Sequence, residues 1–221
     1  MSDLDAVELS TGEDPSAAII WLHGLGADGH DFEPIVPHVL WPDAPVIRFV
    51  FPSAPVRPVT LNGGMPMRAW YDIIGIDSDR GHDQAGIAES VSQVQEFVER
   101  EQRRGIEPGR VVIAGFSQGG AVALHFALRY PHRLAGAVAL STYLLNADEL
   151  RESAHPVNAG LPVFVGHGNM DPVVPFNMGE FLVNELRSMD YEVDWHSYPM
   201  AHAVNPEEIR DIRNWLGKRL G

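Results

Sequence analysis

The chain of 221 residues contains no cysteine. This absence excludes disulfide bonds, thiolate metal sites and a cysteine nucleophile. Basic side chains are few: 16 lysines and arginines stand against 30 aspartates and glutamates, which gives a net charge of −14. Because an acidic surface repels phosphate backbones and anionic lipid headgroups, nucleic acid is not an expected partner.

Long hydrophobic runs are also missing. Runs such as Ala17–Leu22 are far too short to span a bilayer, so we expect no stable membrane insertion. The acidic segment Met1–Glu8 lacks the basic and apolar regions of a signal peptide, which predicts a cytoplasmic protein. Apolar residues make up 45% of the chain and charged residues 21%, and residues 1–221 are expected to form a single domain.

What the chain does contain is a series of short runs rich in β-branched and aromatic residues. Most are apolar on both faces, as in parallel strands covered on both sides. The predicted strands are Ala18–Leu22, Val46–Val50, Val111–Ala114, Leu134–Leu140, Pro162–Val165 and Val193–Tyr198. Helical spacing lies between them, over Ile87–Val98, Ala121–Arg129, Phe181–Met189 and Pro206–Leu216, with Asn205 as the N-cap of the last helix. This alternation predicts a three-layer α/β fold with a mostly parallel central sheet.

One segment does not fit this alternation. Phe51–Met67 is rich in proline and glycine, yet it also carries apolar side chains such as Leu61 and Met65. We interpret it as a long ordered loop, and such loops in compact domains often serve function.

The motif G-x-S-x-G marks a candidate nucleophile. The predicted strand Val111–Ala114 runs into Gly115-Phe116-Ser117-Gln118-Gly119, and a predicted helix follows. A sharp turn of this kind lifts the serine hydroxyl clear of the sheet, and the strand before and helix after it are the context that the motif requires. We therefore predict Ser117 as the nucleophile.

A serine nucleophile needs a histidine base and an acid to orient that base, in the chain order serine, acid, histidine. His202 lies between the last strand and the last helix, at the edge of the sheet where ligand sites of α/β folds gather. Asp171 follows the strand Pro162–Val165 and fits as the acid, with Asp194 and Asp148 as alternatives. His167 is the alternative base, but its neighbour Asp171 fits better as a member of the site.

The loop after the first predicted strand is a candidate for the oxyanion hole, which needs two backbone N–H donors. We expect these donors to be the N–H groups of Leu25, in His23-Gly24-Leu25-Gly26, and of Gln118, next to the nucleophile. His23 is interpreted as a brace for this loop. The glycine pattern from Gly24 also matches a dinucleotide fingerprint, but acidic neighbours and the lack of a long helix after it argue against that function.

Five blocks of residues together resemble a known family. They are His23–Gly29, Met67–Ile73, Gly115–Gly120, His167–Pro175 and Met200–His202, and they occur in this order over nearly the whole chain. The chain is similar to the small bacterial carboxylesterases of the phospholipase/carboxylesterase family, relatives of the acyl-protein thioesterases. The chain departs from the family pattern at two positions. Ala203 stands where serine is common, and Asn205 stands where cysteine is common.

The resemblance implies a minimal α/β-hydrolase with little or no cap and a Ser117, His202 and Asp171 triad. It implies hydrolysis of short- to medium-chain acyl esters, and extends to thioesters and lysophospholipids. Trp70 would form a wall of the acyl pocket, and the other expected substrate-binding residues are Leu61, Met65, Phe116 and Val173. Relatives are often homodimers, so a homodimer is an expected assembly.

Two other hypotheses stay open at this point. The same scaffold also serves lactonases and peptidases, and a hydrolase fold can be kept as a binding module. The binding-module hypothesis requires a missing triad member, and the sequence lacks none. No metal or cofactor is expected, because the mechanism needs none and the histidines show no H-E-x-x-H spacing.

Overall fold

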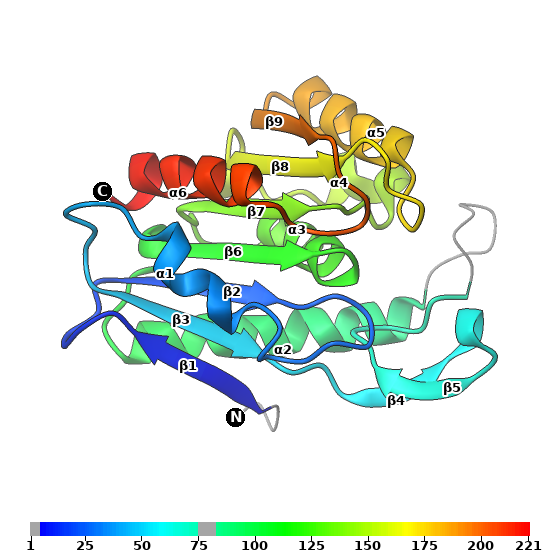
Figure 1. The fold of residues 1–221 in the computed structure, drawn as a ribbon, viewed down its shortest axis with the longest axis horizontal. Helices are drawn as coiled ribbons and strands as arrows, with labels where there is room; N and C mark the ends of the chain where they lie inside the picture. Colours follow the sequence, from blue (N-terminus) through cyan, green and yellow to red (C-terminus); the bar gives the residue numbers. More distant parts are fainter. Residues whose placement is uncertain (1–4, 75–82) are drawn as a thin grey trace.

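The computed structural model describes residues 5–74 and 83–221. Of the N-terminal segment considered above, residues 1–4 lie outside the described residues. The described chain forms a central sheet with helices on both faces (Figure 1). This arrangement confirms the predicted three-layer α/β class.

The main sheet has seven strands in the order β1-β3-β2-β6-β7-β8-β9. Their bounds are β1 (Ala6–Ser10), β2 (Ala17–Leu22), β3 (Ile47–Pro52), β6 (Val111–Phe116), β7 (Gly136–Leu140), β8 (Pro162–Gly168) and β9 (Glu192–Tyr198). Every neighbouring pair is parallel except β1 with β3. Because the parallel strands share one direction, their carboxyl ends gather at a single edge of the sheet.

Two hydrophobic cores lie on opposite faces of this sheet. The first core packs α2 (Gln84–Arg103), α3 (Gln118–Arg129) and α5 (Phe176–Ser188) against the sheet, with the short α4 (Leu150–Ser153) nearby. The second packs α1 (Val36–Val39) and α6 (Pro206–Leu220) against the other face. Figure 1 shows α1 and α6 on the near side of the sheet and α2 and α3 behind it.

The predicted helices are all present, and their ends follow the expected signals. Asn205 caps α6, since its side-chain oxygen accepts the N–H of Glu208 at 2.8 Å. Gly105, which follows α2, adopts a φ of +93° that ends that helix. Among the described residues, no helix is both long and apolar enough to cross a membrane.

The segment Phe51–Met67 differs from the expected loop. It completes β3 and then forms an antiparallel hairpin of β4 (Val56–Val59) and β5 (Met65–Arg68). Proline is tolerated here because each strand of a two-stranded ribbon has a free edge, and Pro58 pairs with Pro66 across it. Figure 1 shows the hairpin extending beyond the carboxyl edge of the main sheet.

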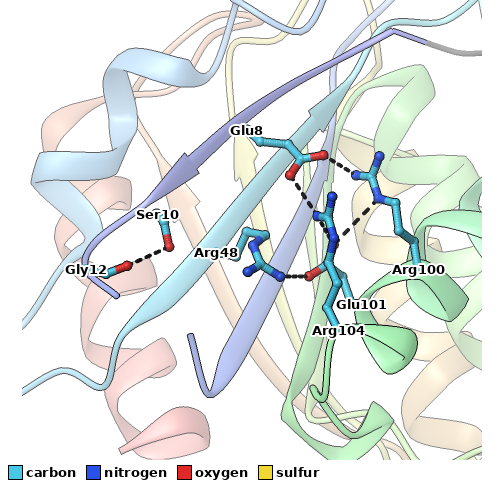
Figure 2. A network of polar contacts seen from close by, with 7 residues as sticks. All are labelled: Glu8, Ser10, Gly12, Arg48, Arg100, Glu101 and Arg104. Carbon is cyan, nitrogen blue, oxygen red and sulfur yellow. Dashed lines mark hydrogen bonds and ion pairs between the residues drawn. The ribbon is translucent and has the colours of Figure 1, made fainter. Parts of the chain in front are cut away.

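The edge strand β1, which the sequence analysis did not predict, is held to α2 by a network of ion pairs (Figure 2). Glu8 of β1 pairs with Arg100 at 2.7 Å and with Arg104 at 2.8 Å. Arg48 of β3 pairs with the fully buried carboxylate of Glu101 at 2.6 Å. Three of the few basic side chains, Arg48, Arg100 and Arg104, therefore form ion pairs at one edge of the sheet.

Candidate active site

Ser117 lies in the turn between β6 and α3, at the carboxyl edge of the sheet. Its φ of 54° and ψ of −121° are a strained combination for a residue with a side chain. The strain is held by two hydrogen bonds, because the Ser117 N–H donates to the Leu140 carbonyl at 2.8 Å and Thr142 Oγ1 donates to the Ser117 carbonyl at 2.6 Å. A β-carbon on Gly115 would lie 2.3 Å from the carbonyl oxygen of Gly119, so the turn closes only with glycine there.

Ser117, His202 and Asp171 form one chain of hydrogen bonds. The distance from His202 Nε2 to Ser117 Oγ is 2.9 Å, and that from His202 Nδ1 to Asp171 Oδ2 is 2.7 Å. A carboxylate only accepts, so Nδ1 carries the proton and Nε2 is free to accept the serine proton. The other oxygen of Asp171 accepts the N–H groups of Val173 and Val174 at 2.8 and 2.9 Å, which fixes the carboxylate in place.

The alternative base and one of the alternative acids have other partners. His167 is fully buried with its Nε2 2.9 Å from the Val174 carbonyl oxygen, and burial lowers its pKa. Its Nε2 lies 3.7 Å from Asp171 Oδ2. Asp194 pairs instead with His196 of the same strand, at 2.9 Å. The structure therefore brings together the three residues that sequence reasoning favoured.

The loop after β2 is held by His23. Its Nε2 accepts the Ala54 N–H at 2.9 Å, so in the neutral ring Nδ1 carries the proton and donates to the Gly24 carbonyl at 2.6 Å. Burial lowers the pKa of His23, which favours this neutral form. The Leu25 N–H has no hydrogen-bond acceptor among the described residues, and the Gln118 N–H opens α3, where no acceptor within the helix exists. Both N–H groups are thus free donors, and their residues line the same cavity as Ser117.

Sequence reasoning missed the role of the Gln118 side chain. Its Oε1 accepts the Trp70 N–H at 2.9 Å, and its Nε2 donates to the Tyr71 carbonyl at 2.8 Å. The amide therefore joins the start of α3 to the segment after β5. A buried Gln beside a nucleophile is compatible with many roles, so the sequence held no signal for this one.

Trp70 differs from the expected wall of the pocket. It is fully buried, does not line the cavity, and donates its Nε1–H to the His23 carbonyl at 2.9 Å. Its indole N–H needs a buried acceptor, and the loop after β2 supplies one. Met65 also lies away from the cavity, since it is 62% exposed on β5. Tyr71, the next residue after Trp70, lines the cavity instead.

A cavity of about 900 Å³ opens beside Ser117. Leu25, Gln118 and His202 line it, as do three of the expected substrate-binding residues, Leu61, Phe116 and Val173. Its other apolar lining residues include Ile73, Ile74, Leu144, Val174, Met178 and Phe181. Several of these apolar side chains, among them Leu61, Val173 and Phe181, are exposed, and an exposed apolar lining is typical of a site for an apolar ligand.

Comparison with known proteins places the chain in a family. Residues 5–220 match the phospholipase/carboxylesterase family. The chain belongs to this family. Membership confirms the predicted α/β-hydrolase fold and the predicted reaction class, the hydrolysis of acyl esters or thioesters by a serine enzyme.

Individual relatives cover almost the whole chain. Acyl-protein thioesterase 1 of Mycosarcoma maydis is 38% identical, over 94% of this chain and 93% of its own. Among solved structures, acyl-protein thioesterase 2 of Zea mays is 30% identical with a TM-score of 0.86, over 98% of this chain and 99% of its own. The carboxylesterase of Bacillus cereus, at 22% identity and a TM-score of 0.75 over 99% of this chain and 95% of its own, shows the shared fold.

Proposed function

We propose that Ser117, His202 and Asp171 are the catalytic triad of this family member. His202 Nε2 takes the proton of Ser117 as Oγ attacks the acyl carbonyl, and then gives it to the departing oxygen or sulfur. Asp171 holds the proton on Nδ1 and stabilises the imidazolium. Water, activated by the same histidine, then releases the acid and restores the serine.

We propose that the tetrahedral intermediate is stabilised by the N–H groups of Leu25 and Gln118. Both are backbone donors beside the nucleophile, and His23 and Gly26 hold the first of them by hydrogen bonds to Ala54 and Arg68. Because these donors are already held in place, they need no reorganisation when negative charge develops on the substrate oxygen. Loss of one such donor typically raises the barrier by about 2.7–4 kcal/mol.

The substrate that we propose is an ester or thioester of a short- to medium-chain acid. The apolar lining of the cavity supports an alkyl chain, and the thioesterase names of the relatives support a thiol leaving group. A complete hydrogen-bonded triad speaks against a silent binding module, which would need a missing member. No observation favours a lactonase or peptidase over an esterase.

Some expectations from the sequence stay predictions. They are a single domain over residues 1–221, a cytoplasmic location, lysophospholipid substrates and a homodimer. The relatives named above at 30% identity or more are fungal and plant proteins, so they do not support the bacterial source that the resemblance suggested.

The observation that carries the proposal is the chain of hydrogen bonds from Ser117 to Asp171 through His202. The test is hydrolysis of p-nitrophenyl esters of two to twelve carbons, without added metal, by the wild type, Ser117→Ala and Ser10→Ala. Ser10 is an exposed serine on β1 and serves as the matched control. We expect activity to vanish only in Ser117→Ala, and a fluorophosphonate probe to label Ser117 in the other two proteins. Full activity in Ser117→Ala would overturn the assignment.

A further inference from the structure

The cavity beside Ser117 has an unbalanced charge. Of the described residues that line it, four carry a formal charge at neutral pH, and all four are acids: Asp31, Asp72, Asp148 and Glu149. No lysine or arginine is among the described lining residues. An open pocket with one sign of charge on its wall attracts ligands of the opposite sign and repels those of its own.

The four acids come from three separate segments, so the charge surrounds the cavity rather than belonging to one turn. Asp31 follows the oxyanion loop, Asp72 follows β5, and Asp148 and Glu149 lie in the turn after β7. Asp31, Asp148 and Glu149 are exposed to solvent at the cavity. Partial desolvation of its carboxyl raises the pKa of Asp31, and the charge of Asp28 raises it further, whereas a nearby cation would favour the charged form.

The basic side chains near these acids lie outside the cavity. Arg129 is close enough to Glu149 for their charges to interact, but it does not line the cavity. Arg68 donates to the Ala54 carbonyl, away from the lining. No ion pair joins any of the four acids to a described residue. The basic side chains of Figure 2 are committed to the edge of the sheet at β1.

We propose that the site selects acyl esters or thioesters whose leaving group carries a positive charge and rejects those whose leaving group is an anion. The inference rests on the proposed function, and it adds the charge of the substrate. The apolar lining takes the acyl chain, while the exposed acids face the alcohol or thiol that departs. The chemistry is unchanged: the acyl group passes from the leaving sulfur or oxygen to Ser117 Oγ, and the serine proton reaches the leaving atom through His202 Nε2.

The test uses three thioesters with one acyl group, butyryl, and three thiols. Thiocholine is the cationic leaving group, 2-mercaptoethanol the neutral one and 3-mercaptopropionate the anionic one. Released thiol is measured with an aromatic disulfide reagent, to which this chain gives no background because it has no cysteine. The readout is the ratio of kcat/KM for the cationic substrate to kcat/KM for the anionic one. Intrinsic reactivity differs between the thiols, but it cancels when a variant is compared with the wild type.

We expect Asp148→Asn/Glu149→Gln, and separately Asp31→Asn, to lower this ratio several-fold, since steering of charged substrates is commonly worth about tenfold or more. Salt of about 1 M, which shortens the screening length to about 3 Å, should lower the wild-type ratio in the same direction. The control is Glu13→Gln/Glu107→Gln, which removes the same charge from exposed positions before β2 and β6, at the opposite end of the strands.

The outcomes separate the inference from the proposed function. A ratio that stays constant in the cavity variants, or that falls equally in the control, overturns the inference while the esterase stands. Failure of the wild type to hydrolyse the neutral thioester, or equal hydrolysis by Ser117→Ala, overturns the proposed function itself. A fall in the cavity variants alone supports the inference.

Discussion

Gly119, in the first turn of α3, packs directly against His23 of the loop after β2. A β-carbon on Gly119 would lie 2.4 Å from the carbonyl oxygen of His23 and 2.5 Å from that of Leu22. Both are backbone atoms, and Leu22 is held in the sheet by its pairing with Gly115. The helix that follows the nucleophile therefore reaches the proposed oxyanion loop only because position 119 has no side chain.

Gly119→Ala is expected to lower both stability and activity. The methyl group would force the two backbones apart, at a cost of about 1–3 kcal/mol in unfolding free energy. It would also shift Gln118 relative to Leu25, and so misalign the proposed oxyanion donors. Thermal melts and kcat on a p-nitrophenyl ester measure the two effects.

Gly217→Ala is the matched control for this variant. In α6 a β-carbon at position 217 would meet only the ring of Trp41, at an ordinary 3.6 Å. Alanine in place of glycine within a helix stabilises by about 0.5–1 kcal/mol, so this variant should melt slightly higher and keep full activity. If the two variants behaved alike, glycine at position 119 would not be needed for the close packing of α3 against the backbone of Leu22 and His23.

Asp171→Asn should leave the fold intact and reduce kcat by about 10⁴-fold. The amide oxygen can still accept the N–H groups of Val173 and Val174, but the amide nitrogen would face His202 Nδ1. The imidazole would then hold its proton on Nε2 and could not accept the serine proton. Ester hydrolysis at saturating substrate gives the comparison, with Asp194→Asn expected near the wild-type rate. Near-normal turnover by Asp171→Asn would move the acid to another residue.

The sequence was sufficient to nominate the proposed triad, because Ser117 carries a local signal and the expected chain order restricts the other two members. Gly115 and Gly119 around Ser117 report a turn that only glycine permits, and the chain order then leaves few candidates for Asp171 and His202. Helix ends were predictable for the same reason, as Asn205 shows with its cap on α6. Such signals depend on residues close in sequence.

The features that the sequence did not predict depend on contacts between distant segments. The sequence alone does not tell whether Trp70 lines a pocket or donates a hydrogen bond to the His23 carbonyl. The structure decides, because it shows that hydrogen bond between residues 47 positions apart. The hairpin of β4 and β5 was hidden by prolines that normally oppose strands. The strand β1 alternates in burial and is held by Glu8, whose partners lie on α2.

Trp70→Phe tests whether this tryptophan braces the oxyanion loop or contacts substrate. The variant removes the Nε1–H donor and leaves the His23 carbonyl without it, a change that costs about 1–3 kcal/mol for a buried group. We expect kcat to fall by about tenfold or more while the preferred acyl-chain length stays the same. Leu61→Ala, which alters the cavity lining, should shift that preference instead. A shifted chain-length optimum in Trp70→Phe would return Trp70 to the acyl pocket.

Glu208 is a buried acid beside β8. It lies in the first turn of α6 with no exposed surface, and a β-carbon on Gly166 of β8 would lie 2.1 Å from its Oε1. The pKa of Glu208 is raised from an ordinary 4.5 to about 8: burial is the main cause, the backbone N–H of Asn205 partly opposes it, and the charge of nearby Asp211 adds to it. The folded protein therefore holds a proton that the unfolded chain releases at lower pH.

This proton makes the folded state less stable as the pH rises between the two pKa values. From about pH 4.5 to about pH 8 the unfolded chain binds fewer protons than the native state at this position, so the free energy of unfolding falls with pH and then levels off. Glu208→Gln keeps the shape and cannot ionise, so its melting temperature should match the wild type near pH 5 and exceed it increasingly toward pH 8. Glu207→Gln, an exposed neighbour on the same turn, is the control and should differ from the wild type by an amount independent of pH. A constant difference for Glu208→Gln across this range would mean that Glu208 ionises as readily in the folded protein as in the unfolded chain.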